Sequence, residues 1–162
     1  MNRTISGFIL FLIAGGAATD ARAFCAYHRQ MYAKTTLAQE FRDSKWIARA
    51  TVISAKSWRG KHDWGTTYNL KRVVIYKGQL PQTFALSTER NSGGFYLDMG
   101  MKPDIGGEYL LFLIPDSSPA EHPAAVRKSL WINYSCGQSR SWSEVSGGQR
   151  AQLIQLSRNA GP

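Results

Sequence analysis

The sequence has few of the residues from which enzyme sites are usually built. Of its 162 residues, two are cysteine and three are histidine, and 11 acidic residues stand against 20 basic ones. No C-x-x-C or H-x-x-H spacing occurs, so the sequence predicts no metal site and no cofactor. No G-x-S-x-G marks a nucleophile, and no carboxylate pair suggests a glycosidase. A Ser/His/Asp site using His62 and Asp63 stays open, but the pattern as a whole argues against an enzyme.

Long apolar runs are also scarce, and the main one lies at the start of the chain. Met1-Asn2-Arg3 is basic, residues 5–18 are apolar, and Ala21-Arg22-Ala23 has the A-x-A form of a signal-peptidase site. The run is too short to span a membrane comfortably. We therefore expect residues 1–23 to be a signal peptide and residues 24–162 to be one exported domain, periplasmic or secreted, with no later transmembrane segment.

The two cysteines allow one intramolecular pairing, Cys25 with Cys136, and export makes that disulfide chemically reasonable. The bond would join positions 111 residues apart. Closing so long a loop stabilises the folded state by about 4–5 kcal/mol in the chain-entropy model. Two free thiols are the alternative, which fits an exported protein less well. The disulfide would also leave no thiol for cysteine catalysis.

The net charge of +9 favours acidic partners, although it is also compatible with a role in solubility alone. The basic residues are scattered and form no block, so nucleic acid is disfavoured as a partner while an anionic ligand stays open. Aromatic and basic residues alternate at Trp58-Arg59 and Tyr76-Lys77, where they could stack bases or sugars. We favour the simpler interpretation that they cover the ends of a barrel.

Periodicity predicts a mainly β domain with five strands and two short helices. The strands are expected at residues 46–54, 68–76, 83–88, 108–114 and 130–134. Residues 35–43 and the segment after the S-x-x-Q capping box at Ser146 are expected to be helical. Residues 57–66, which are polar and contain two glycines, are predicted to be a loop, and residues 95–107 an irregular connection. A five-stranded Greek-key OB-fold barrel with two flanking helices suits this inventory, with a small sandwich as the alternative.

Several short motifs, taken in order, resemble one known family. Tyr68-Asn69-Leu70-Lys71 leading to Tyr76-Lys77-Gly78 looks like the second strand and turn of the tissue inhibitors of metalloproteinases (TIMPs). Leu97-Asp98-Met99-Gly100 and Glu108-Tyr109-Leu110 resemble the next stretch of the family's inhibitory domain. A third group of residues resembles the end of that domain: Cys136, Trp142, Val145-Ser146, Gln149-Arg150 and Leu153. The resemblance runs from about Cys25 to Arg158 and implies a TIMP-like, netrin-like OB-fold domain.

The resemblance also implies a partner and a binding surface. TIMPs begin with a cysteine whose amine and carbonyl chelate the catalytic zinc of the target protease, next to a loop held by a disulfide. A neutral amine is a good zinc ligand, and the disulfide holds it rigid. The implied partner is therefore a protein, with a zinc endopeptidase as the most specific candidate. The implied contact residues here are Phe24, Cys25, Ala26 and Tyr27 with the loop Arg90, Asn91, Ser92, Gly93 and Gly94.

The chain departs from the family at the reactive end. Cys25 takes the place of the second cysteine of the family's C-x-C, so the first would fall at Ala23, before the predicted cleavage point. Its loop partner would fall near Gly93, where no cysteine occurs. The terminal amine would then belong to Phe24, without the disulfide that fixes it in TIMPs. A non-inhibitory interaction domain, which binds a protein or an anionic ligand through its basic surface, is the alternative.

Overall fold

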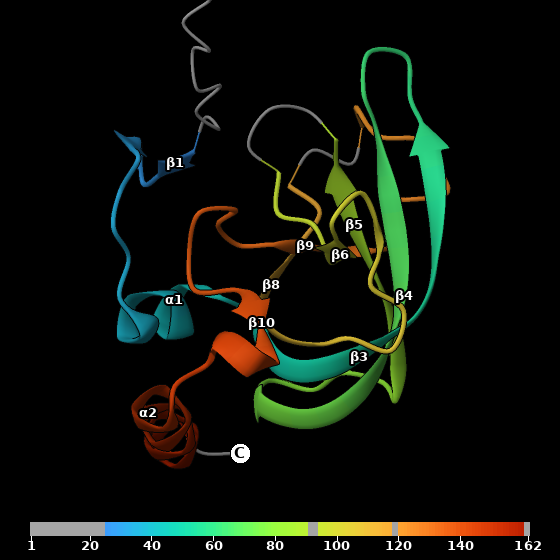
Figure 1. Cartoon of the computed structure of the whole chain (residues 1–162). Coiled ribbons are helices and arrows are strands. Elements are labelled where there is room, and N and C mark those ends of the chain that lie inside the picture. Colours follow the sequence, from blue (N-terminus) through green and yellow to red (C-terminus); the bar gives the residue numbers. More distant parts are fainter. Residues whose placement is uncertain (1–24, 91–93, 118–119, 161–162) are drawn as a thin grey trace, which may run out of the picture.

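The computed structural model describes residues 25–90, 94–117 and 120–160. The predicted signal peptide and Phe24 lie outside these ranges. In chain order the elements are β1 (Ala26–Tyr27), β2 (Gln30–Met31), α1 (Leu37–Asp43), β3 (Trp46–Arg59), β4 (Trp64–Lys77), β5 (Thr83–Glu89), β6 (Asp98–Met99), β7 (Lys102–Pro103), β8 (Glu108–Pro115), β9 (Leu130–Ile132), β10 (Arg140–Ser141), the 3-10 helix η1 (Trp142–Glu144) and α2 (Gly147–Asn159) (Figure 1).

Five strands form a closed ring in the order β8-β3-β4-β5-β9, with β9 pairing back to β8. Neighbouring strands are antiparallel except β5 and β9, which are parallel and meet at Leu86 and Leu130. Ring closure pairs strand edges that would otherwise be exposed. The predicted mainly β class is therefore confirmed, and the sheet is barrel-like.

The interior of the ring is apolar and comes from alternate positions of the strands. On β3, Ala48, Ala50 and Val52 are buried while Arg49 and Thr51 are partly exposed, as the period of two requires. The main core cluster consists of Ala48, Ala50, Val52, Tyr68, Leu70, Leu80, Phe84, Leu86, Leu97, Tyr109, Leu111 and Leu113. This cluster holds the strands in register, because a slip by one residue would turn its side chains outward.

Both helices belong to a second apolar cluster on the outer side of β3 and β8. Its members are Leu37, Phe41, Ile47, Leu110, Phe112, Val145 and Leu153. Strand β8 therefore buries both of its faces, which explains its continuous apolar sequence. Each helix begins with a reciprocal capping box, Thr36 with Gln39 in α1 and Ser146 with Gln149 in α2. The two predicted helices and the second capping box are confirmed.

The predicted loop at residues 57–66 is too long: residues 60–63 connect the strands, whereas residues 57–59 and 64–66 belong to β3 and β4. Strands β3 and β4 continue as a long hairpin, paired from Ile47 with Lys77 to Arg59 with Trp64. Gly65 belongs to β4 and does not form a turn: a Cβ atom there would lie 1.9 Å from the carbonyl oxygen of Thr88 and 2.6 Å from the Trp58 ring. The polar composition misled the prediction because residues 57–64 are exposed or only partly buried, although Gly65 and Thr66 are buried. The predicted irregular connection at 95–107 contains only the short β6–β7 hairpin.

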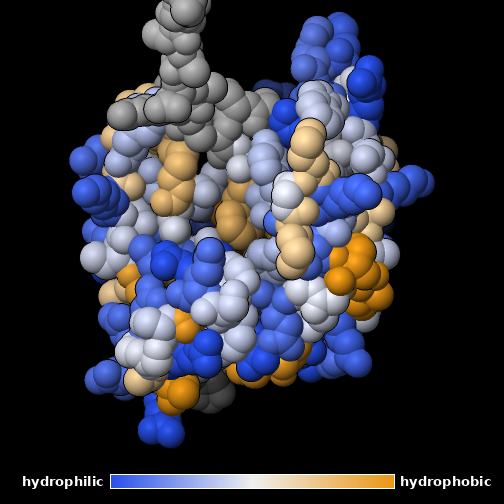
Figure 2. All heavy atoms as spheres, viewed as in Figure 1, coloured by the Kyte–Doolittle hydropathy of each residue, from blue (hydrophilic) through white to orange (hydrophobic). Residues whose placement is uncertain are grey.

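Figure 2 shows a largely hydrophilic face on which apolar side chains form small, separate patches. In the part of the chain that the structure describes, neither helix has the length and apolar character needed to cross a membrane.

Candidate functional site

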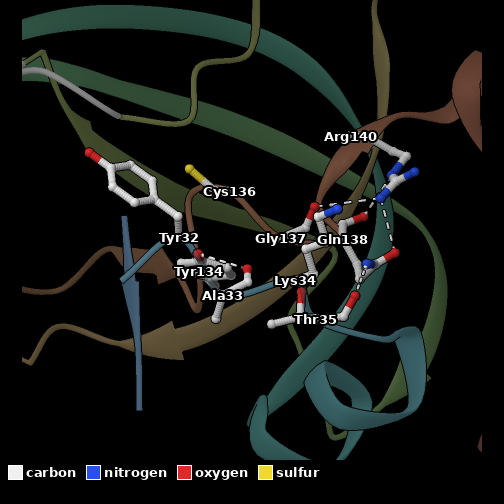
Figure 3. A pocket seen from close by; sticks show the side chains of 9 residues that line it. All are labelled: Tyr32, Ala33, Lys34, Thr35, Tyr134, Cys136, Gly137, Gln138 and Arg140. Carbon is white, nitrogen blue, oxygen red and sulfur yellow. Dashed lines mark hydrogen bonds between the residues drawn. The ribbon is translucent and has the colours of Figure 1, made fainter. Parts of the chain in front are cut away.

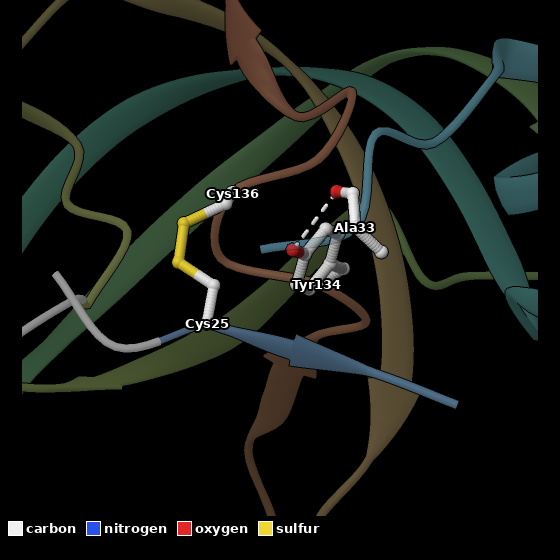
Figure 4. Close-up of a disulfide and its surroundings, with 4 residues drawn as sticks. All are labelled: Cys25, Ala33, Tyr134 and Cys136. Atoms are coloured by element: carbon white, nitrogen blue, oxygen red, sulfur yellow. Dashed lines mark hydrogen bonds between the residues drawn. A yellow bond between two sulfur atoms is a disulfide. The ribbon is translucent and has the colours of Figure 1, made fainter. Parts of the chain in front are cut away.

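A disulfide attaches the start of the described chain to the barrel. Cys25 and Cys136 are bonded, with their Cα atoms 6.1 Å apart, as predicted (Figure 4). Cys25 is 3% exposed, so this anchor point is buried against the body of the protein. Neither β1 nor β2 pairs with a strand of the ring. The covalent bond therefore fixes a segment that no ladder of the barrel holds.

The tethered segment forms a small hairpin with an unusual backbone. Tyr27 pairs with Gln30, and φ is +48° at His28 and +66° at Arg29. Positive φ at both central residues is the property of a type I′ turn, which normally favours Asn and Gly. Tyr32 also has positive φ, at +51°, and its N–H donates to the Cys25 carbonyl oxygen at 2.8 Å. These three are the non-glycine residues with positive φ in the described ranges, and all lie within this short segment.

Aromatic and carboxylate contacts hold the hairpin against α1. The Tyr27 hydroxyl donates to Asp43 Oδ2 at 2.6 Å, and the rings of Tyr27 and Tyr134 lie 4.9 Å apart. Burial, together with the hydrogen bond to Asp43, raises the pKa of Tyr27 to about 12. The same hydrogen bond lowers the pKa of Asp43. His28 and Arg29 at the tip remain exposed, so the hairpin presents a basic end on a rigid base.

A pocket of about 330 Å³ opens beside the disulfide (Figure 3). It lies between the chain after the hairpin and the segment that follows Tyr134, and its lining residues are Tyr32, Ala33, Lys34, Thr35, Tyr134, Cys136, Gly137, Gln138 and Arg140. Lys34 and Arg140 are basic, and no lining residue is acidic. Gln138 joins the two walls by donating from Nε2 to the Thr35 carbonyl oxygen at 2.7 Å. The pocket therefore suits a carboxylate or another anionic group.

A buried glutamate lies behind the pocket wall. Glu40 is 0% exposed, and its Oε1 accepts hydrogen bonds from the Thr35 hydroxyl and from the Gln138 N–H, the latter at 2.9 Å. Gly137 lies so close that a Cβ atom there would approach Glu40 Oε1 to 2.1 Å. Burial raises the pKa of Glu40, although these hydrogen bonds act in the opposite direction. Glu40 thereby links α1 to both walls of the pocket.

The predicted contact surface also includes the loop at residues 90–94, and the structure describes only part of this loop. Phe24, Asn91, Ser92 and Gly93 lie outside the described residues. The Arg90 guanidinium forms an ion pair with Asp98 and lies 4.6 Å from the centroid of the Tyr96 ring. Its side chain is only 20% exposed, so it is part of the barrel wall. Gly94 is partly buried against Tyr96. Contact between this loop and a partner stays a prediction.

The three histidines differ in burial and in their neighbours. His28 and His62 are exposed. His122 lies in a loop but is only 7% exposed, among Asp63, Glu89 and Asp116. Burial alone would lower the pKa of His122, but the hydrogen bonds and charges of Asp116 and Glu89 raise it overall. No spacing motif could reveal this cluster, since its members come from separate segments.

Sequence reasoning also missed the pocket residues Lys34, Gln138 and Arg140. The available signal was the polar stretch Gly137-Gln138-Ser139-Arg140 directly after a disulfide cysteine. No protein-family model matches the chain, and no curated protein is significantly similar to it. The resemblance to TIMPs therefore rests on the sequence motifs alone.

Proposed function

We propose that this chain is an exported binding module that attaches to a protein partner through its amino-terminal edge. The observation that carries the proposal is the disulfide-anchored hairpin, in which His28, Arg29 and Tyr32 all have positive φ. Such conformations cost free energy and persist where the surroundings enforce them, often at binding sites. A rigid edge also loses little conformational entropy on binding.

We also assign the barrel to the Greek-key OB-fold class. The support is the order of the ring, in which the first ring strand, β3, pairs with β4 and β8, and the third and last, β5 and β9, are parallel. Helices α1 and α2 flank this ring. The assignment agrees with the TIMP-like motifs, which imply the same fold.

Inhibition of a zinc endopeptidase is the most specific form of this function. In that form the free amine of Phe24 approaches the catalytic zinc of the protease, while Cys25–Cys136 holds the following residues. A non-inhibitory interaction domain is the second candidate. It is favoured by the basic pocket, in which Lys34 and Arg140 would receive an anionic group of the partner.

Assays with the mature, exported protein separate these candidates. Mass spectrometry should first find Phe24 as a free terminus. The protein is then tested against a panel of zinc endopeptidases, with and without acetylation of Phe24. Loss of inhibition on acetylation supports the amine mechanism, whereas equal potency refutes it.

If no protease is inhibited, site-specific photo-crosslinking tests the binding function itself. A crosslinker at position 29, at the hairpin tip, is compared with one at position 158, an exposed site on α2. We expect a discrete protein adduct from position 29 that is weaker when Lys34 and Arg140 are both changed to glutamate. Equal adducts from positions 29 and 158 would contradict binding through the amino-terminal edge.

A further inference from the structure

We propose that Asp63, Glu89 and His122 bind a divalent transition-metal ion, with zinc the best fit, and that Asp116 orients the histidine. Their candidate ligand atoms all lie within 4.8 Å of one another. Asp63 lies in the turn between β3 and β4, Glu89 ends β5, and His122 lies in the connection from β8 to β9. The site would therefore join three separate connections of the barrel.

The distances between the candidate ligand atoms are compatible with one shared metal ion. His122 Nε2 is 2.9 Å from Glu89 Oε1 and 3.9 Å from Asp63 Oδ2. Zinc binds nitrogen and carboxylate oxygen at about 2.0–2.2 Å, so neighbouring ligands of a tetrahedral site lie about 3.4 Å apart. The observed separations lie on either side of this value. The third separation, between Glu89 and Asp63, is at most 4.8 Å. Rotation of the two carboxylate side chains would bring all three ligand atoms around one ion. The ion would replace the proton that Nε2 shares with Glu89, and this proton would pass to solvent.

Asp116 gives the histidine the orientation that a metal ligand needs. Both of its carboxylate oxygens lie 2.9–3.0 Å from His122 Nδ1, and its side chain is only 3% exposed. Nδ1 therefore donates its hydrogen to Asp116, which directs Nε2 toward Glu89 and Asp63. A carboxylate behind a ligating histidine is a common arrangement in metal sites. The ring is also stacked on Trp131, with centroids 4.4 Å apart and an interplanar angle of 12°.

The charge of the cluster provides a second argument. The chain has only 11 acidic residues, yet three of them surround this one histidine. Even with His122 protonated, the four side chains carry two negative charges in excess. Asp63 Oδ1 is buried and accepts no hydrogen bond. A buried carboxylate oxygen without a partner is costly, and a divalent cation bound to the other oxygen, Oδ2, would stabilise the same carboxylate.

The donor set narrows the choice of ion. One imidazole nitrogen and two carboxylates suit zinc or manganese, whereas calcium prefers six to eight oxygen ligands. Zinc generally binds nitrogen and oxygen sites more tightly than manganese. Three protein ligands would leave a position for water or for a group of a partner.

The test is zinc binding by the folded, disulfide-bonded chain after chelator treatment and dialysis. Tryptophan fluorescence provides the readout, since Trp58 and Trp131 both lie against His122. We expect one zinc ion per chain, measured by elemental analysis, a saturable fluorescence change and a higher melting temperature. Manganese should bind more weakly at the same site. Absence of zinc binding at micromolar concentrations would overturn the proposal.

Variants decide whether the ion occupies this cluster. Asp63→Asn and Glu89→Gln should each weaken zinc binding by about 100-fold or more, because each removes a ligand charge. Asp116→Asn should weaken it by about 10–100-fold. The control is Asp43→Asn, which alters the other carboxylate that contacts a histidine, His28, in the described ranges and should leave binding unchanged. Circular dichroism confirms folding. Wild-type affinity in both Asp63→Asn and Glu89→Gln would place the ion elsewhere and refute the site.

Discussion

Charged side chains contribute very differently to the stability of this protein, and the contribution of each depends on how deeply it is buried. Arg90 and Asp98 form an ion pair whose carboxylate side chain is 5% exposed, whereas Arg42 beside Asp43 is 71% exposed. Glu40 is completely buried and joins α1 to the pocket wall. Buried charges lose their hydration, so removing one partner leaves the other without compensation. Exposed charges remain hydrated and contribute little.

Arg90→Met should therefore destabilise the protein strongly. The variant leaves the buried Asp98 carboxylate without its cation, which typically costs about 3–5 kcal/mol. Urea unfolding measures the loss. Arg42→Met is the matched control and should cost less than about 1 kcal/mol, since Arg42 is mostly exposed. Equal losses in the two variants would show that the Arg90 ion pair adds nothing to the stability.

Glu40 should make stability depend on pH. Burial raises its pKa in the folded chain above the ordinary value of 4.5, so the folded state retains a proton that the unfolded state has released. This contribution is complete below about pH 4.5 and is lost as the pH rises through the raised pKa. Unfolding free energies measured from pH 4 to pH 8 should therefore decline less steeply in Glu40→Gln than in the wild type. Glu121→Gln, at an exposed position, is the control, and parallel curves for wild type and Glu40→Gln would contradict the prediction.

Secondary-structure elements depend on both local signals and neighbouring strands. The helices start where Thr36 and Ser146 supply their caps, so a few adjacent residues determine them. The long β3–β4 hairpin is different, because part of it is polar and glycine-containing and is held by pairing along its length. Gly65 shows this directly, since the Thr88 carbonyl and the Trp58 ring leave no space for a side chain.

Two glycines provide a matched test of this difference. Gly65→Ala should destabilise the protein by about 1–3 kcal/mol or more, because the new methyl group would overlap the Thr88 carbonyl oxygen. Gly147→Ala, in the first turn of α2, meets no atom within 4 Å and should be neutral or stabilise by up to about 1 kcal/mol. Thermal unfolding of both variants gives the comparison. A neutral Gly65→Ala would show that the hairpin can relax around the added methyl group.

At the scale of the whole molecule, the described chain is a closed ring of strands to which the β1–β2 hairpin is attached by the disulfide. Most core residues contact neighbours within the ring or under the helices, whereas the β1–β2 hairpin depends on Cys25, Tyr27 and a few hydrogen bonds. The barrel and the hairpin should therefore respond differently when the disulfide is removed.

A Cys25→Ser/Cys136→Ser variant should lose about 2–5 kcal/mol of unfolding free energy but keep its barrel. Amide hydrogen exchange should rise most in residues 26–34 and least in β3 and β8, since ring pairing protects those two strands. Reduction of the wild-type disulfide should reproduce the effect. A uniform rise in exchange across the chain would show instead that the bond holds the whole barrel together.

The sequence alone predicted the mainly β class, the two helices, the positions of the five ring strands and the Cys25–Cys136 bond. These features depend on short-range periodicity, on capping residues three positions apart, or on there being only two cysteines. The resemblance to TIMPs also suggested the amino-terminal edge as a binding surface, which stays a prediction. It did not reveal the basic pocket, because the walls come from segments about a hundred residues apart.

Tertiary structure alone decided the extent of the β3–β4 hairpin, the inward position of Arg90 and the environment of His122. Each depends on which strands become neighbours when the ring closes, and local composition carries no information about that. Asp63, Glu89 and His122 have no shared spacing in the chain, yet ring closure brings their ligand atoms within 4.8 Å of one another. A pattern of caps and periodicity is a property of consecutive residues, whereas a cluster of this kind is a property of the folded chain.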